Sequence, residues 1–122
     1  MTLTNNEIYN YTRALLEAFQ DGEQRLPIKV NFYLQKNKNT LIALAQDIEK
    51  ARMEIAQQYG KLDEETQQYI ISEDKIAEAS KEIADLFNLE QEVAISKINI
   101  DSLSDDITLT TAQMEAIMFM ID

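Results

Sequence analysis

Apolar residues recur at three- and four-residue steps near the start of the chain, which predicts an amphipathic helix over residues 4–20. Its apolar stripe is formed by Ile8, Tyr11, Leu15 and Phe19, and is widened by Leu16. Thr4 and Glu7 have the spacing of a capping box, in which each side chain binds the other residue's backbone N–H. Gly22 follows and can end the helix in the left-handed conformation.

A longer pattern predicts a second helix over residues 27–59. Pro27 suits the first position of a helix, because its missing N–H costs no hydrogen bond there. The apolar residues fall on two heptad positions, which together form a seam: Leu34, Leu41, Ile48 and Ile55 on one, Val30, Leu44 and Ala51 on the other. Such a helix would be about 50 Å long, whereas a compact domain of this size is only about 35 Å wide. The helix therefore either breaks near residues 37–40 or projects and buries its seam against another chain.

Two features of this segment leave alternatives open. Asn37 is a polar residue on the seam. We favour its interpretation as a break or an exposed end of the helix, and the alternative is a buried polar group that fixes the register with a partner. Residues 26–32 alternate between apolar and polar, which is the pattern of a strand. We favour a helix there, because the heptad continues beyond these residues.

The second half of the chain changes its pattern several times. Residues 61–72 are interpreted as a connection that contains a short β-prone run, Tyr69-Ile70-Ile71. Ser72 can then cap a third helix over residues 73–88, and the acids of its first turn complement the helix dipole. The buried face of this helix is formed by Ile76, Ala79, Ile83, Leu86 and Phe87.

The stretch over residues 89–109 has two interpretations. Its β-branched residues change phase, as in a bulged strand, and we favour a strand that pairs with residues 69–71. Alternatively the third helix continues, since Leu89, Val93 and Ile100 also fit one helical face.

Thr110 and Gln113 form a second capping box, which predicts a short terminal helix over residues 111–121. The inner face of this helix would be formed by Met114, Ile117, Met118 and Ile121. Phe119 and Met120 would then point away from that face. They are therefore candidates for contact with another chain, as methionine adapts easily to a partner.

Composition excludes much of the chemistry that proteins perform. The 122 residues include no Cys, His or Trp. Zinc, haem and iron–sulfur sites therefore lack their usual ligands, and no histidine can serve as the base of a nucleophilic triad. A hydrophobic content of 45% suits one globular domain over residues 1–122. We expect no secretory signal and no membrane-spanning helix, because no apolar run approaches about 20 residues.

The formal net charge of −11 is divided unevenly. Residues 1–61 hold eight bases and seven acids, whereas residues 62–122 hold three bases and fifteen acids. Direct binding of nucleic acid needs Lys and Arg, so we expect none from the second half. Its acidic face could instead imitate nucleic acid in a basic groove of another protein. The candidates for this acidic face are Asp63, Glu64, Glu65, Asp105 and Asp106.

Carboxylates are the only plentiful reactive groups. Glu78 and Glu82 lie one helical turn apart, as in a metal-binding or general acid–base pair, but Lys75 and Lys81 lie among them, as on a solvated helix face. The acids of residues 101–106 lack the central glycine and the bidentate glutamate of an EF-hand calcium loop. We therefore expect no catalytic residue, no metal and no cofactor.

Three short segments carry a family resemblance. They are Leu26-Pro27-Ile28-Lys29-Val30, Lys97-Ile98-Asn99-Ile100-Asp101-Ser102-Leu103, and Leu109-Thr110-Thr111-Ala112-Gln113-Met114 with Ala116-Ile117 and Phe119-Met120-Ile121. Together they resemble a family of small proteins of unknown function encoded by tailed phages and prophages of Gram-positive bacteria. In that family a proline often follows the capping threonine of the last helix, where this chain has Thr111. The resemblance implies a phage or prophage origin and a place in the bacterial cytoplasm, and it carries over no functional residue.

The sequence thus predicts a mainly α fold, a helical bundle or hairpin with one long helix and a small β element before a short C-terminal helix. The second helix should pair antiparallel with the third, and the first should pack across them. We expect a non-enzymatic phage accessory protein that acts through protein–protein contact, above all self-association.

The expected contact residues are six from the seam and two near the C-terminus: Val30, Leu34, Leu41, Leu44, Ile48, Ile55, Phe119 and Met120. The seam residues could instead form the core of a single chain. An acidic inhibitor of a host defence or nucleic-acid-handling protein is the alternative, and a carboxylate-dependent hydrolase is the remote one. We expect no membrane, nucleic acid or small-molecule substrate as a partner.

Overall fold

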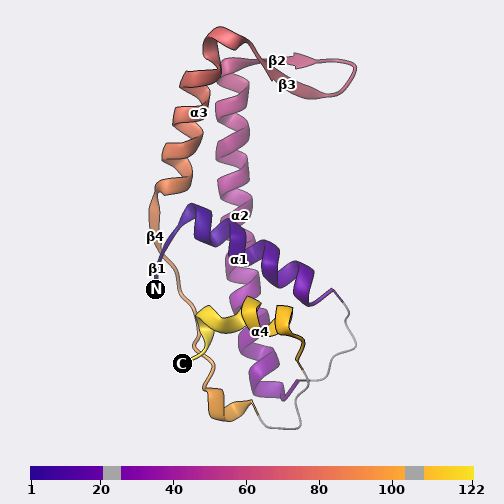
Figure 1. Ribbon diagram of the computed structural model, residues 1–122, viewed down its shortest axis with the longest axis vertical. Coiled ribbons are helices and arrows are strands. Elements are labelled where there is room, and N and C mark those ends of the chain that lie inside the picture. Colours follow the sequence, from indigo (N-terminus) through magenta and orange to yellow (C-terminus); the bar gives the residue numbers. More distant parts are fainter. Residues whose placement is uncertain (21–25, 104–108) are drawn as a thin grey trace.

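The chain folds mainly into α-helices, as the sequence predicts (Figure 1). The computed structural model describes residues 1–20, 26–103 and 109–122. The elements in chain order are β1 (Thr2–Thr4), α1 (Asn5–Ala18), α2 (Ile28–Tyr59), β2 (Gly60–Asp63), β3 (Gln68–Ile71), α3 (Glu73–Asn88), β4 (Glu90–Glu92), a 3-10 helix (Ile100–Ser102), α4 (Thr111–Ile117) and a second 3-10 helix (Met118–Met120). The first three predicted helices agree with these bounds to within two residues, and the fourth is shorter. The predicted stop at Gly22 lies outside the described residues.

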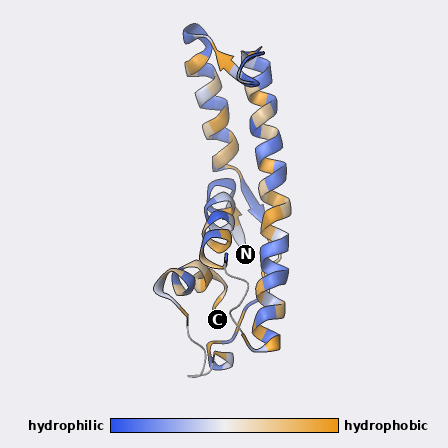
Figure 2. Ribbon diagram, turned by 90° about the vertical axis from the view of Figure 1, so that its right-hand side faces the viewer, coloured by the Kyte–Doolittle hydropathy of each residue, from blue (hydrophilic) through white to orange (hydrophobic). Residues whose placement is uncertain are grey.

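The long helix α2 is unbroken over 32 residues, which makes it about 48 Å long. Of the two alternatives that the length of this helix left open, a break near residues 37–40 is therefore excluded, because no glycine or proline interrupts the backbone hydrogen bonds there. The helix favoured over a strand for residues 26–32 is confirmed from Ile28 onward. One side of α2 stays uncovered along its length (Figure 2).

The helix α3 runs antiparallel beside α2, and α1 crosses α2, which is the predicted arrangement (Figure 1). The Tyr59 hydroxyl at the end of α2 donates a 2.8 Å hydrogen bond to Glu82 of α3. This bond raises the pKa of Tyr59, because an ionised phenol would have no proton to donate to the carboxylate. Tyr9 of α1 packs edge-on against Phe87 of α3, with ring centroids 5.7 Å apart.

A β-hairpin occupies the region predicted as a plain connection, residues 61–72. Its strands β2 and β3 pair antiparallel and project sideways from the end of α2 (Figure 1). Gln67, with φ of 60°, closes the turn, and its amide donates to the Asp63 carbonyl at 2.8 Å. The predicted pairing of residues 69–71 with the stretch after α3 is wrong, because β3 pairs with β2. The stretch after α3 begins at the end of α3 that lies far from the hairpin.

The stretch after α3 pairs with the N-terminus of the chain. Its strand β4 forms an antiparallel ladder with β1, in which Leu3 lies opposite Gln91. Beyond β4, residues 93–99 neither continue α3 nor form the bulged strand predicted there, and Ile98 makes a single parallel bridge with Ile121. This segment pairs with residues near both ends of the chain, and no local sequence pattern predicts such long-range pairing.

Both predicted capping boxes are present. The Thr4 hydroxyl accepts a hydrogen bond from the Glu7 amide at 3.1 Å, and Thr110 accepts one from the Gln113 amide at 3.1 Å. The Gln113 side chain also donates to the Ala18 carbonyl at 3.0 Å. The cap of α4 therefore also satisfies a carbonyl at the end of α1.

Most of the hydrophobic core lies in one half of the molecule. The core cluster comprises Leu3, Ile8, Leu15, Val30, Leu34, Leu41, Ile48, Val93, Ile98, Ala116, Ile117 and Met120. We call the half that contains it the base, which consists of residues 1–20, 26–50, 86–103 and 109–122. Residues 51–85 form the arm: the end of α2, the β-hairpin and most of α3. Within the arm, all of which the structure describes, the buried apolar residues are Ala56 and Ala79.

Candidate functional site

The predicted seam of α2 is used inside the molecule. Four of its residues are buried in the core of the base with 3% or less of their surface exposed: Val30, Leu34, Leu41 and Ile48. Leu44 is half-buried against this core, and Ile55 is half-buried in the arm. Of the two roles that the sequence leaves open for these residues, the structure assigns the core. A partner could reach the four buried residues only by displacing the segments that cover α2.

Asn37 is fully buried, so its interpretation as a break or an exposed helix end is wrong. Its side-chain Nδ2 donates to the Ser96 carbonyl at 2.8 Å, and its Oδ1 accepts from the Ser96 amide at 2.7 Å. Both bonds satisfy backbone groups of an extended segment, groups that would be costly to bury unpaired. Asn37 therefore fixes the position of this segment on α2 within one chain.

The two C-terminal contact candidates do not face outward as predicted. Met120 is fully buried, and its sulfur lies 3.4 Å from Asn37 Nδ2. Phe119 is half-buried and stacks on Tyr11, with ring centroids 4.2 Å apart. The prediction fails because α4 ends at Ile117 and the next turn is a 3-10 helix, which changes the angle between successive side chains. Met118, assigned to the inner face, is instead 62% exposed.

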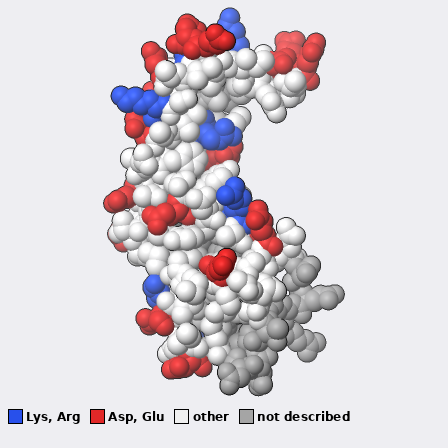
Figure 3. Space-filling model, viewed as in Figure 1, with Lys and Arg blue, Asp and Glu red and all other residues white. Residues whose placement is uncertain are grey.

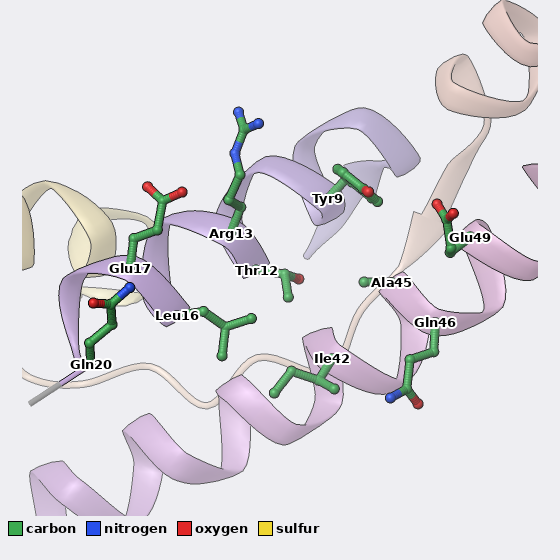
Figure 4. A pocket seen from close by; sticks show the side chains of 10 residues that line it. All are labelled: Tyr9, Thr12, Arg13, Leu16, Glu17, Gln20, Ile42, Ala45, Gln46 and Glu49. Carbon is green, nitrogen blue, oxygen red and sulfur yellow. The ribbon is translucent and has the colours of Figure 1, made fainter. Parts of the chain in front are cut away.

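A groove opens where α1 crosses α2 (Figure 4). It has a volume of about 450 Å³ and is lined by Tyr9, Thr12, Arg13, Leu16, Glu17, Gln20, Ile42, Ala45, Gln46 and Glu49. Leu16 of α1 and Ile42 of α2 face each other across it, and Leu16 is 45% exposed. The Thr12 hydroxyl donates to the Ile8 carbonyl at 2.7 Å, so its polar atom is satisfied within α1. The floor of the groove is therefore apolar.

Charged side chains line the rim of this groove. Arg52 donates to Glu49 through Nε at 3.0 Å, and this hydrogen bond lowers the pKa of the Glu49 carboxyl. Arg13 and Glu17 point away from the floor (Figure 4). The groove can bury an apolar side chain. The sequence gives one signal for it, Leu16 beside the main stripe of the first helix, but the opposite wall exists only because the two helices cross.

An apolar and basic surface lies at the start of α2. Ile28 is 88% exposed and Phe32 is 62% exposed, and they lie one helical turn apart. Lys29 and Lys36 are exposed on the same turns of α2. Residues 26–46 contain three lysines and no acid. We call Ile28, Lys29, Phe32 and Lys36 the base end.

The β-hairpin at the opposite end of α2 exposes one apolar residue on each of its faces, because Leu62 pairs with Tyr69 and Ile70 pairs with Lys61. Leu62 of β2 is 48% exposed, and Ile70 of β3 is 60% exposed. Glu64 and Glu65 are exposed in the turn between them. Figure 3 shows acidic side chains at this end of the molecule, with basic ones among them, and a hollow in the outline below the hairpin. We call Leu62, Glu64, Glu65 and Ile70 the arm tip.

The acidic residues singled out from the sequence therefore separate. Glu64 and Glu65 are exposed on the arm tip. Asp63 is half-buried and accepts a 3.1 Å hydrogen bond from the Glu65 amide, so its carboxylate serves the hairpin turn. Asp105 and Asp106 lie outside the described residues.

Comparison of the chain with protein-family models, with curated proteins and with solved structures finds no match. No helix in the described part of the chain is long and apolar enough to cross a membrane. Among residues 1–20, 26–103 and 109–122, no three Asp, Glu, His or Cys side chains are grouped so that they could hold a metal ion.

Proposed function

We propose that this chain is a non-enzymatic accessory protein of a tailed phage or prophage, that it acts by binding protein, and that it associates with itself. The three short segments that resemble the phage family support the origin and a place in the cytoplasm of the bacterial host. The lack of Cys and His argues against enzymatic chemistry.

The arm is the observation that carries the proposal. It holds two large apolar residues, Leu62 and Ile70, which are 48% and 60% exposed at the free end of a helical hairpin. The hydrophobic core of the base does not contain the arm tip. Large exposed apolar side chains on a projecting element are typical of surfaces that bind another protein. The acids beside them disfavour contact with nucleic acid.

Affinity capture from phage-infected or lysogenic cells tests this function. The tagged wild type is compared with the arm-tip variant L62S/I70S and with the matched control L89S, because Leu89 is 58% exposed but lies outside the arm. We expect partners that are retained by the wild type and L89S and lost with L62S/I70S. Equal recovery by all three proteins would argue against binding through the arm.

The charge of the arm supports a second candidate function, the acidic inhibitor of a host defence or nucleic-acid-handling protein. Residues 60–85 contain eight acids and three bases. Acidic mimicry of nucleic acid predicts that binding weakens steeply with salt and is lost in E64Q/E65Q. Capture that is insensitive to salt would exclude this candidate and leave apolar contact as the basis of binding.

A further inference from the structure

The two strands of the β-hairpin differ in charge. β2 carries Lys61 and Asp63, whereas the residues of β3, Gln68-Tyr69-Ile70-Ile71, include no charge. Charged side chains on an edge strand hinder its pairing with a further strand, whereas aromatic and β-branched residues favour such pairing. Of the two strands, β2 is therefore protected and β3 is open to a third strand.

The outer edge of β3 is unpaired within the described part of the chain. Its sheet has two strands, so β2 is the one neighbour of β3. Beyond that ladder, no backbone or side-chain group of the described residues hydrogen-bonds the backbone of residues 68–71. In the view of Figure 1, β3 is the lower strand of the hairpin, and Figure 3 shows the hollow below the hairpin in the same view. A third strand therefore has room beside β3 and would pair backbone groups that now face solvent.

A strand added beside β3 would contact apolar side chains on both faces of the sheet. Because successive residues alternate, Tyr69 and Ile71 lie on one face and Ile70 lies on the other. Leu62 lies on the face of Tyr69, opposite which it pairs. This division of apolar residues between two faces suits a third strand, whose own side chains alternate in the same way.

Acidic residues flank β3 at both of its ends. Glu64 and Glu65 are exposed in the turn that precedes it. Glu73 and Asp74 are exposed in the first turn of α3, which follows it, and the adjoining Lys75 offsets one of these four charges. Lysine or arginine on both sides of an extended partner segment would complement the remaining negative charge.

The same acids oppose pairing of β3 with β3 of a second copy. In an antiparallel pair, the turn of each copy would lie beside the first turn of α3 of the other copy. In a parallel pair, the two turns would meet, and so would the two starts of α3. Both arrangements bring acids together, which is destabilising. The occupant favoured by these charges is therefore a segment of a different protein.

We propose that β3 binds an extended segment of a partner protein as a third strand. The segment has β-branched or aromatic residues at its centre and lysine or arginine at both ends. Backbone hydrogen bonds supply the affinity of such strand addition, and the side chains supply its specificity. This inference rests on the proposed binding of protein through the arm, and it names the chemistry of the partner.

Titration of the full chain with a synthetic peptide tests this inference. The probe is a peptide with blocked ends and the sequence Lys-Lys-Val-Thr-Val-Thr-Lys-Lys. We expect a Kd below about 1 mM, measured by NMR at physiological salt, where charges more than about 8 Å away are largely screened. Amide hydrogen exchange should slow in β3 and stay unchanged in β2.

Two control peptides separate backbone pairing from charge. N-methylation of the central Val and Thr residues removes their backbone donors, and replacement of all lysines by glutamate brings like charges together. Each change should weaken binding about tenfold or more. The variant E64Q/E73Q, which neutralises one acid at each end of β3, should weaken binding of the lysine peptide about threefold. The matched control E54Q/D85N neutralises two exposed acids elsewhere in the arm and should leave binding unchanged.

The outcomes distinguish this inference from the proposed function. Binding that survives N-methylation, or that slows exchange outside β3, overturns the third strand. Equal binding of the lysine and glutamate peptides overturns the basic partner, and no binding of the lysine peptide overturns the inference as a whole. A failure of the proposed function shows separately, as equal affinity capture by the wild type and L62S/I70S.

Discussion

The base and the arm share one helix but are stabilised differently. In the base, α2 packs against α1 and against the extended segment that Asn37 hydrogen-bonds, and Leu41 and Ile48 are almost completely buried. In the arm, the same helix packs against α3 and the hairpin, and the buried apolar side chains are two alanines, Ala56 and Ala79. Stability therefore resides in the base, and the arm is a projection that exposes apolar residues.

Buried polar residues sharpen this contrast. Asn5, Asn37 and Gln113 are buried in the base, and each hydrogen-bonds a backbone carbonyl of a segment distant in sequence. The main polar link of the arm, the bond from Tyr59 to Glu82, lies at the surface between half-buried side chains. A buried amide with both its groups paired specifies one arrangement of segments, whereas a surface bond competes with water.

The largest expected effect compares two isoleucines one heptad apart on α2. Ile48→Ala should lower the free energy of unfolding by about 2–5 kcal/mol, because Ile48 is 2% exposed in the base and its truncation leaves a cavity. Ile55→Ala, at a half-buried site in the arm, should cost less than half as much. Urea denaturation followed by circular dichroism measures both, and equal losses would mean that the arm is packed as tightly as the base.

The second prediction concerns the buried amide. Asn37→Ala should destabilise the protein by about 1–3 kcal/mol, because the Ser96 amide and carbonyl lose their partners. Asn39→Ala is the matched control, since Asn39 lies on the exposed side of the same helix, and it should change stability by no more than about 0.5 kcal/mol. Thermal unfolding of the two variants measures this difference in stability. An Asn37→Ala variant as stable as the wild type would refute the role given to this residue.

The third prediction compares helix caps in the two regions. Thr4→Ala should cost about 1 kcal/mol, because it removes a capping box at the start of α1. Ser72→Ala at the start of α3 should cost no more than about 0.5 kcal/mol, since the Ser72 side chain makes no hydrogen bond to the helix backbone. The Ser72 hydroxyl instead lowers the pKa of Asp74 through a hydrogen bond. The denaturant midpoints of the Thr4→Ala and Ser72→Ala variants test this prediction. A larger loss of stability in Ser72→Ala would contradict it.

The smallest expected effect concerns the ion pair at the boundary of base and arm. Arg52 lowers the pKa of Glu49 below its ordinary value of 4.5, so the pair stabilises the fold above that value and is lost as the pH falls through the lowered pKa. Both side chains are partly exposed, so Glu49→Gln should cost only about 0.5 kcal/mol at neutral pH. The difference between variant and wild type should vanish in acid, and a difference that persists there would rule out the ion pair as its source.

The sequence determines the helices and their caps by itself, because these depend on neighbours within one or two turns. The stripe of the first helix, the heptad of the second and the boxes at Thr4 and Thr110 are all local patterns, and the structure confirms them. The hairpin was missed because its turn uses Gln67 at positive φ, where a glycine or asparagine would have given a signal.

Tertiary contacts decided what the apolar and polar positions of those helices do. The heptad pattern alone allows the seam of α2 to bind a partner, but in the structure distant segments of the same chain cover it. The sequence alone allows a helix break at Asn37, but in the structure Asn37 hydrogen-bonds the distant Ser96. The predicted outward placement of Met120 is wrong because the last turn is a 3-10 helix, and the bridge between Ile98 and Ile121 joins that turn to a distant segment. Periodicity determines which residues share a face, whereas burial depends on the segments that the rest of the chain places against it.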